Sequence, residues 1–367
     1  MICSLQKKEI EEIRPTNILP QTTFWGRLKS EQGFIPCGFE LTVSKDLIYN
    51  SSESSITVND DILVLIKYID ANFCYAYVPY GPELEPDFEN HGVFLEEISE
   101  ILKLQLPSNC VFIRYDLLWQ NQWAVEDDSF DEAGNWIGPP QNEIQELRVN
   151  FKTENWNLKK SPRDLLPKNT FFLDLSLNER DLLYNMRYNT RYNIRNAHKK
   201  GIQVKEYGIE QIDNWYHLYK ETATRQSLPM QHKEYFSSII KNQDNTRNGV
   251  KVKMLMADRD GTFLASMFLV LSNKKAIYLY GASSSANKDL MASYALQWES
   301  IKMAKNLGYS KYDMFGSAPN LKHKHPLSGI HIYKKGFGGK LFHRMGCWDY
   351  PYNHKIYELY KMHELSN

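Results

Sequence analysis

The sequence predicts an α/β protein with mixed sheets, divided into two domains. Segments typical of strands and of amphipathic helices alternate along the chain, and 367 residues exceed what one hydrophobic core usually serves. The charge changes sign at mid-chain: residues 1–150 hold 10 basic and 25 acidic groups, whereas the remainder holds 34 and 19. A domain boundary at about residue 165 fits this change, because the run 159–167 is loop-like and contains two prolines.

The first half shows strand and helix patterns in alternation. Alternating apolar residues and aromatic clusters predict strands, and apolar residues at helical spacing with acidic residues on the other face predict a helix. We expect a short helix over 21–29, strands over 39–43, 62–68 and 73–78, a helix over 93–104, and a strand over 110–115 that ends at Asp116.

The second half repeats the alternation. Ser176 is expected to cap a helix that starts at Asn178, with Glu179 in its first turn. Further elements are expected as a strand over 170–175, helices near 211–224 and 233–241, strands over 250–257 and 263–271, a strand from Ile277, a helix through Trp298, a strand near 308–316 and a glycine-flanked loop that carries Tyr333 and Lys334.

Several classes of protein are disfavoured. The sequence has no apolar run long enough to span a bilayer, and its N-terminus lacks the apolar core of a signal peptide, so we expect a cytoplasmic protein. Five cysteines without Cys-x-x-Cys spacing favour reduced thiols over a disulfide framework. Histidines in 321–326 and His331 resemble a metal cluster, but no cysteine or carboxylate completes a ligand spacing, so we expect a mobile loop and no metal.

A basic stripe in the second half indicates a polyanionic partner. No acidic residue occurs from 187 to 205, and on a helix the basic side chains would form one stripe. They are Arg187, Arg191, Arg195, Lys199 and Lys200. The stripe is either a solvated helix face or, given the basic second half, a contact for RNA phosphates. The same spacing recurs in Tyr184, Tyr188 and Tyr192, a pattern that is more often packing than base stacking.

Six short motifs follow one another along most of the chain. They are Gln21-Thr-Thr-Phe-Trp-Gly-Arg-Leu-Lys29, Tyr77-Val-Pro-Tyr-Gly-Pro82, Ile113-Arg-Tyr-Asp116, Arg191-Tyr-Asn-Ile-Arg-Asn-Ala-His-Lys-Lys-Gly201, Tyr280-Gly-Ala-Ser283 with the helix through Trp298, and Tyr333-Lys-Lys-Gly-Phe-Gly-Gly339. In this order they resemble the Fem family (FemABX type) of peptidoglycan-bridge aminoacyltransferases. The chain has no room for the long helical arm that staphylococcal-type members insert, so it resembles the compact members.

The resemblance implies two acetyltransferase (GNAT)-like domains in tandem. Residues 1–165, completed by 347–367, would bind the precursor, and residues 166–346 would bind aminoacyl-tRNA. The implied reaction moves an amino acid from aminoacyl-tRNA to the side-chain amine of a peptidoglycan precursor, forming an interpeptide bridge. The acceptor is UDP-MurNAc-pentapeptide or its lipid-linked form, and the latter would bring the protein to the inner membrane surface. Because the ester donor is already activated, no cofactor is expected.

The resemblance also implies roles for individual residues. Lys334, beside Tyr333, is the cation near the tRNA acceptor end and the ester oxygen; otherwise it would be a solvated lysine. Lys29 binds the precursor's diphosphate, and Arg225 is a second phosphate clamp or a surface ion-pair partner. Asp116 either orients and deprotonates the attacking amine or caps the next helix. Three further tyrosines line the substrate cleft or belong to the core or its rim: Tyr77, Tyr80 and Tyr280.

The sequence leaves two alternative functions open. An acyl-coenzyme A-dependent N-acyltransferase of the GNAT superfamily normally carries a glycine-containing pyrophosphate loop after the central strand. The corresponding connection here, Ser283 to Asp289, contains no glycine. A non-catalytic RNA-binding module would use the basic stripe, but it would leave Lys29, Asp116 and Lys334 without a role.

Overall fold

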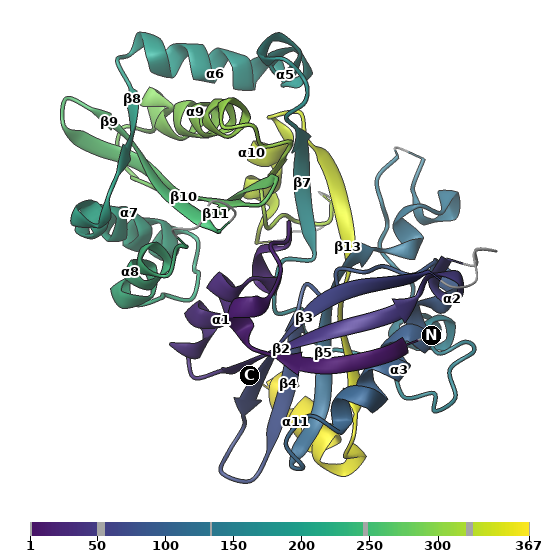
Figure 1. Ribbon diagram of the computed structural model, residues 1–367. Helices are drawn as coiled ribbons and strands as arrows, with labels where there is room; N and C mark the ends of the chain where they lie inside the picture. Colours follow the sequence, from purple (N-terminus) through teal and green to yellow (C-terminus); the bar gives the residue numbers. More distant parts are fainter. Residues whose placement is uncertain (1, 50–55, 133, 245–248, 321–325, 367) are drawn as a thin grey trace. The chain divides into compact units, whose positions relative to one another are not determined.

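The computed structural model (Figure 1) describes residues 2–49, 56–132, 134–244, 249–320 and 326–366. The chain forms two compact units. Unit 1 comprises Met1–Lys168 and His343–Asn367, and unit 2 comprises Asn169–Phe342. Each unit is built around a mixed β-sheet, so the α/β class that the sequence predicts is confirmed.

Unit 1 contains a sheet in the order β1-β2-β3-β4-β5-β13, with β6 beside β13. Its strands are β1 (Ile2–Lys8), β2 (Ile35–Ser44), β3 (Thr57–Tyr68), β4 (Cys74–Pro79), β5 (Cys110–Gln120), β6 (Lys159–Lys160) and β13 (Lys340–Pro351, from His343 onward in this unit). Its helices are α1 (Thr23–Ser30), α2 (Lys45–Tyr49), α3 (His91–Lys103), α4 (Asn142–Val149) and α11 (His354–Ser366). Only β4 and β5 pair in parallel, and α3 lies between them in the chain. This mixed sheet agrees with the predicted α/β fold class.

Strand β5 is longer than the sequence predicts. Leu117 and Trp119 continue the alternation of buried side chains toward the core under α3, so the strand runs past Asp116 to Gln120. The expectation that this strand ends at Asp116 is therefore wrong, and so is the alternative in which Asp116 caps the next helix. Asp116 lies on the other face of the sheet, the same face as Phe112 and Arg114, which contact α11.

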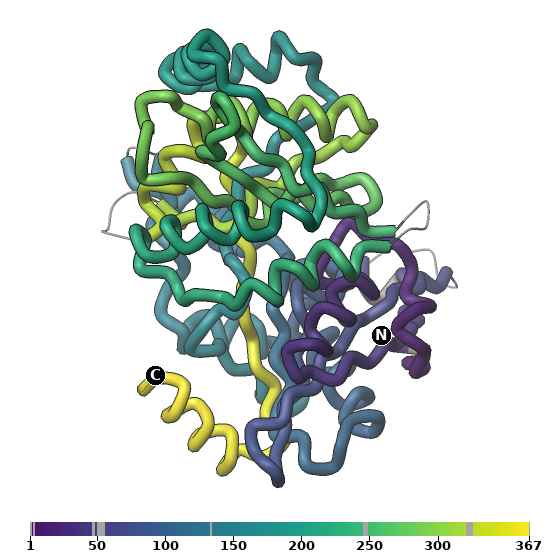
Figure 2. The backbone as a smooth tube through the Cα atoms, turned by 90° about the vertical axis from the view of Figure 1, so that its left-hand side faces the viewer, coloured from purple at the N-terminus to yellow at the C-terminus, as the bar shows by residue number. Residues whose placement is uncertain are grey.

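The C-terminal segment completes the sheet of unit 1. Strand β13 pairs antiparallel with β5. In Figure 2 the yellow C-terminal segment runs alongside blue segments from the first half of the chain. Arg114 holds this segment by two-pronged hydrogen bonds to Asp349 on β13 (2.7 and 2.8 Å) and to Glu364 on α11 (2.7 and 2.9 Å). Arg114 and Asp349 are 1% and 0% exposed, so each of the two buried charges is compensated by the other.

Replacing Arg114 should therefore strongly destabilise unit 1. Arg114→Met leaves the buried Asp349 carboxylate without its counter-ion, and we expect a loss of about 3–5 kcal/mol in the free energy of unfolding. Arg148→Met is the matched control, because its ion pair with Glu126 is exposed and should contribute less than about 1 kcal/mol. Urea unfolding monitored by circular dichroism measures both variants. Equal stabilities for the two would contradict this interpretation.

Unit 2 contains a sheet in the order β7-β12-β11-β10-β9-β8, in which only β11 and β12 pair in parallel. Its strands are β7 (Asn169–Asp174), β8 (Gln203–Tyr207), β9 (Lys251–Arg259), β10 (Thr262–Ser272), β11 (Lys275–Ser283) and β12 (Lys311–Asp313). Its helices are α5 (Glu179–Asn185), α6 (Tyr188–Lys199), α7 (Ile212–Arg225), α8 (Lys233–Lys241), α9 (Ala292–Asn306) and α10 (Ser328–Lys335). Figure 1 shows α6 and α9 on one face of this sheet and α7 and α8 on the other.

Two local predictions in unit 2 are corrected. Helix α5 is capped by Asn178, whose side chain accepts the Asp181 N–H at 3.0 Å, whereas the Ser176 hydroxyl donates to Asp174. Tyr333 and Lys334 lie in the last turn of helix α10 rather than in a loop, because the glycines that end the helix come after Lys335. Among the described residues, no helix is long and apolar enough to cross a membrane.

Candidate active site

Asp116 in unit 1 is a buried carboxylate with one oxygen unused. Its Oδ2 atom accepts the Tyr77 hydroxyl (3.1 Å) and the Leu166 N–H (2.8 Å). Its Oδ1 atom is buried and has no hydrogen-bond partner among the residues that the structure describes. Burial, together with the charge of Asp164, raises the pKa of Asp116 to about 6. A carboxylate that titrates near neutrality and has a free acceptor atom is suited to exchanging a proton.

Tyr80 follows Pro79, which pairs with Asp116 across β4 and β5, and its side chain holds the segment of unit 1 that ends at Lys168. Its hydroxyl donates to the Pro167 carbonyl oxygen at 2.5 Å, and the Arg344 guanidinium lies 4.5 Å from its ring centre. Arg344 donates to the same carbonyl at 3.0 Å. Tyr77 and Tyr80 are both about 4% exposed, so in unit 1 they act as buried supports of the Asp116 segment.

Lys29 forms a cationic pair with Lys67, a residue that the sequence analysis did not identify. Lys29 Nζ donates to Gln32 Oε1 at 2.7 Å, and Lys67 Nζ donates to the Gln32 carbonyl oxygen at 3.0 Å. Both ammonium groups also lie over the Phe34 ring, at 6.0 and 4.9 Å. Burial and the Lys67 charge lower the pKa of Lys29 to about 8. In the described residues neither lysine has an ion-pair partner, so the pair suits an anionic ligand.

Lys334 in unit 2 is buried, which excludes the solvated lysine that the sequence allowed. Its Nζ atom donates to the carbonyl oxygens of Phe315 (2.5 Å) and Gly316 (2.7 Å), and it lies 5.2 Å from the ring centre of Tyr278. Burial lowers the pKa of Lys334 to about 7, and the nearby Asp313 carboxylate opposes this shift. The site therefore places a cation with a near-neutral pKa in a low-dielectric environment.

Asp313 shapes the turn on which Lys334 rests. It ends β12, and its Oδ1 atom accepts the Thr170 hydroxyl and the Phe315 N–H (2.8 Å). Phe315 adopts a positive φ of 54°, a conformation that needs such local support outside glycine. Asp313 thus holds the turn, the role that its position at a strand end indicates.

Three other predicted residues of unit 2 are engaged within the fold. Tyr280 exchanges a hydrogen bond of 3.1 Å with the Tyr235 hydroxyl, and the Tyr333 hydroxyl donates to the Ser293 carbonyl at 2.8 Å. Burial raises the pKa of both Tyr280 and Tyr333. Arg225, the last residue of α7, donates to the Ser283 carbonyl oxygen (3.2 Å) and to the Ser285 hydroxyl (2.9 Å). Arg225 therefore supports the connection after β11.

The predicted basic stripe lies on α6, and three of its members bind groups of the protein itself. Arg191 donates to the carbonyl oxygens of Tyr184 (3.1 Å) and Met186 (2.5 Å) and so caps the end of α5. Lys200 pairs with Asp289 at 3.0 Å. The other three members are exposed: Arg187, Arg195 and Lys199. Of these three, Arg195 also donates its Nε–H to the Arg191 carbonyl oxygen at 3.3 Å, while its guanidinium remains exposed.

Within the described residues, no cluster of three or more histidine, cysteine or acidic side chains could hold a metal ion. His331 is buried against Ser317 and the Ala318 carbonyl oxygen, and residues 321–325 lie outside the described residues. Four described cysteines are free thiols: Cys37, Cys74, Cys110 and Cys347.

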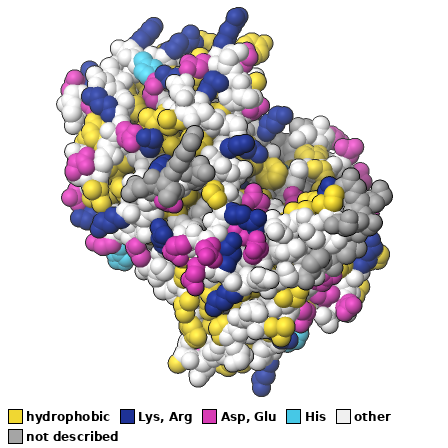
Figure 3. Space-filling view, viewed as in Figure 1, with side chains coloured by type: hydrophobic (Ala, Val, Ile, Leu, Met, Phe, Trp, Pro, Cys, Tyr) yellow, Lys and Arg dark blue, Asp and Glu magenta, His cyan; other side chains and the backbone are white. Residues whose placement is uncertain are grey.

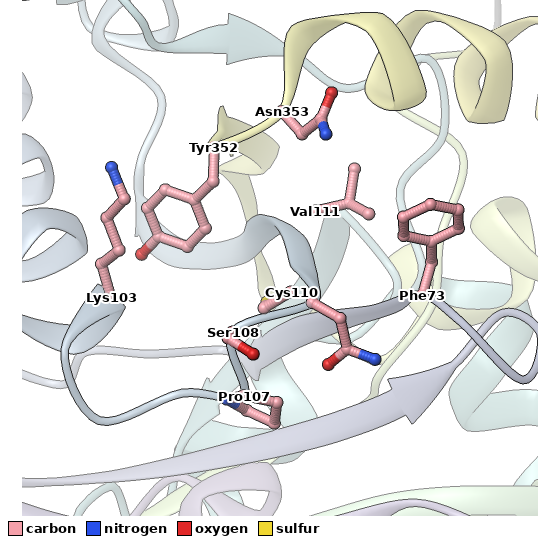
Figure 4. Close-up of a pocket in the computed structure, with 9 residues that line it drawn as sticks. Phe73, Lys103, Pro107, Ser108, Cys110, Val111, Tyr352 and Asn353 are labelled. Atoms are coloured by element: carbon pink, nitrogen blue, oxygen red, sulfur yellow. The ribbon is translucent and has the colours of Figure 1, made fainter.

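A pocket of about 390 Å³ in unit 1 lies away from Asp116. It opens where β5 begins, and Figure 4 shows Lys103, Cys110 and Tyr352 among its walls. Asp116 lies six residues further along β5, roughly 20 Å away. No residue that the sequence analysis assigned to the site lines this pocket.

Comparison with known proteins assigns the chain to a family. The model of the FemAB family matches residues 14–251 and 241–364. Curated relatives include a lipid II:glycine glycyltransferase of Staphylococcus haemolyticus (28% identical over 149 residues, 41% of this chain and 34% of the relative). Another is the enzyme of the same name from Staphylococcus aureus (28% identical over 142 residues, 38% of this chain and 33% of the relative). The matches thus span about a third of these relatives.

A solved structure shares the fold over almost the whole chain. The crystal structure of FemX superposes with a TM-score of 0.69 at 18% sequence identity, covering 96% of each chain. The resemblance noted in the sequence is confirmed by the family match, which covers nearly every described element. This chain belongs to the FemAB family.

Proposed function

We propose that this protein transfers an aminoacyl group from aminoacyl-tRNA to the side-chain amine of the stem peptide of a peptidoglycan precursor. Membership of the FemAB family and relatives named lipid II:glycine glycyltransferases support the reaction class. The observation that carries the proposal is the buried Lys334 ammonium, seated on two carbonyl oxygens after β12. Such a preorganised cation can stabilise charge that develops on an ester oxygen.

The two units have separate roles in this proposal. In unit 1, the Lys29 and Lys67 ammonium groups hold the precursor's diphosphate, and Asp116 accepts a proton from the acceptor's side-chain ammonium, which frees the neutral amine to attack. In unit 2, Lys334 stabilises the oxyanion when the amine adds to the ester carbonyl. The tetrahedral adduct then collapses: the new amide forms, the carbon–oxygen ester bond breaks, and the ribose hydroxyl of the tRNA leaves with a proton.

An acyl-coenzyme A donor is disfavoured by the connection after β11. The Glu221 carboxylate accepts the Ser285 N–H at 2.7 Å and the Ser284 hydroxyl at 3.3 Å. A pyrophosphate would need these donors and would meet a negative charge instead. An aminoacyl ester on tRNA does not require a pyrophosphate to bind at the connection after β11.

A transfer assay tests the proposal. Purified protein is mixed with a pool of radiolabelled aminoacyl-tRNAs and either nucleotide-linked or lipid-linked pentapeptide precursor, with labelled acyl-coenzyme A as a parallel donor. Label should reach at least one precursor from tRNA only, and the labelled amino acid identifies the donor. Transfer of label from acyl-coenzyme A to a precursor would refute the proposal. So would the absence of transfer from both donors.

A further inference from the structure

Three tyrosines form an exposed row on α5 and α6. Tyr184, Tyr188 and Tyr192 are 82%, 67% and 54% exposed, although each follows the last by four residues. The packing interpretation that the sequence favoured is therefore wrong for this row. The buried face of α6 consists of Thr190, Ile194 and Ala197 instead. Large aromatic rings exposed to solvent are available to a partner.

Cations accompany these rings. Arg187, Arg195 and Lys199 are exposed, and within the described residues none of the three has an ion-pair partner. No acidic residue occurs in the sequence from 187 to 205. Figure 3 shows dark blue side chains, with yellow ones nearby, at the edge of unit 2 where α5 and α6 lie. The surface thus combines positive charge with aromatic faces.

This combination fits single-stranded nucleic acid better than a lipid surface. Unpaired bases stack on aromatic side chains while basic groups contact the phosphates. A helix that inserts into a lipid interface carries leucine, phenylalanine or tryptophan on its apolar face, and here the exposed face has tyrosines only. Tyr188 and Tyr192 both lie on α6 and are about 6 Å apart along its axis, close to twice the roughly 3.4 Å rise of one nucleotide, so a base can lie between these two rings. Tyr184 lies on α5, before the extended residues Met186 and Arg187.

The row begins beside the helix that carries Lys334. The Arg187 N–H donates to the Gly336 carbonyl oxygen at 2.9 Å, which joins the start of α6 to the end of α10. Lys334 lies in the last turn of α10. Arg191 binds the Tyr184 carbonyl oxygen and so keeps the first tyrosine next to α6. A strand that follows the row toward α10 would approach the Lys334 turn.

We propose that Tyr184, Tyr188 and Tyr192 stack the unpaired nucleotides next to the aminoacyl end of the tRNA, while Arg187 and Arg195 contact their phosphates. This inference rests on the proposed function, because it takes aminoacyl-tRNA as the donor. It adds a recognition surface in unit 2 that binds RNA through base faces as well as through charge. Sequence preference should be weak, because every base has a face that can stack.

The test uses the full chain and uncharged tRNA, without acceptor. Three triple variants replace the row by alanine, leucine or phenylalanine, and fluorescence anisotropy measures the dissociation constant for intact tRNA and for tRNA that lacks its unpaired 3′ nucleotides. The alanine and leucine variants should bind intact tRNA about 10-fold or more weakly, and the phenylalanine variant within about threefold of the natural protein. The shortened tRNA should bind all four proteins alike.

Several outcomes would overturn the inference. They are equal binding of intact tRNA by the natural protein and the alanine variant, a phenylalanine variant as weak as alanine, or an equal loss with the shortened tRNA. Binding to vesicles of phosphatidylglycerol that is lost in the alanine variant, with RNA binding unchanged, would assign the row to a membrane instead. Because no transfer is measured, failure of this inference is separate from failure of the aminoacyl-transfer reaction, which the transfer assay detects.

Discussion

Lys334→Met is expected to lower kcat for aminoacyl transfer about 10²–10³-fold while leaving the fold intact. The lysine supplies a preorganised positive charge for the oxyanion, and methionine fills a similar volume without it. Lys335→Met is the matched control, because Lys335 is the next residue on the same helix and is exposed. Rates with labelled aminoacyl-tRNA at saturating acceptor measure the effect. Equal rates for the two variants would exclude a catalytic role for Lys334.

The effect of Lys334 should depend on pH. Since burial lowers its pKa to about 7, the ammonium is lost as pH rises above 7. The ratio of natural to Lys334→Met activity should therefore fall roughly 10-fold between pH 7 and pH 8.5. The ratio cancels the ionisation of the acceptor amine, which is common to both proteins. A ratio that stays constant over this range would contradict the assigned charge.

The same variant should be at least as stable as the natural protein. The pKa of Lys334 in the folded state lies below its ordinary value of 10.5, so the cost of burying the ammonium is full below pH 7 and declines as pH rises toward 10.5. The stability advantage of Lys334→Met should thus be largest below pH 7 and shrink at pH 9. Thermal unfolding at both pH values provides the comparison.

Asp116→Asn is expected to lower kcat at least about 10²-fold, because the amide cannot accept the amine proton. It should also change stability in a defined direction. Burial raises the pKa of Asp116 from 3.8 to about 6, so the stability contributed by the protonated carboxyl is full below pH 3.8 and is lost as pH rises through 6. The variant should therefore gain stability relative to the natural protein between pH 4 and pH 7.5.

The control for Asp116 is an exposed carboxylate of the same unit. Asp127→Asn should leave both kcat and the pH dependence of unfolding unchanged, since Asp127 is exposed. If Asp116→Asn behaves like Asp127→Asn in the transfer assay, Asp116 is a structural residue only. If its stability relative to the natural protein does not change between pH 4 and pH 7.5, the carboxyl does not titrate in that range.

Local sequence patterns predict which helices and strands exist better than they predict the residue at which each one ends. The α/β alternation, the helix over 233–241 and the strand that ends at Asp313 were visible because they depend on residues near in sequence. The end of β5 was not visible in the sequence, because Leu117 and Trp119 are buried in a hydrophobic core formed by residues that are distant in the sequence. Helix α10 was missed because the glycines at 336, 338 and 339 suggested a loop over its last turn.

The candidate site was predictable where a family motif marked it, and not elsewhere. Lys334 and Asp116 were identified from motifs, but their burial and altered pKa values depend on Phe315, Gly316 and Leu166, which no local pattern links to them. Lys67 was overlooked because its proximity to Lys29 arises only when β3 packs beside α1. The exposure of the tyrosine row likewise follows from which face of α6 meets α9, and spacing alone cannot decide that.

The most direct test of the central claim is the chemical structure of the product. After reaction with charged tRNA and the pentapeptide precursor, tandem mass spectrometry locates the added residue. The account predicts a single amino acid joined by an amide bond to the side-chain amine of the stem peptide's diamino acid, absent with Lys334→Met. Addition to any other group of the precursor, or an acyl group derived from coenzyme A at the same amine, would contradict it.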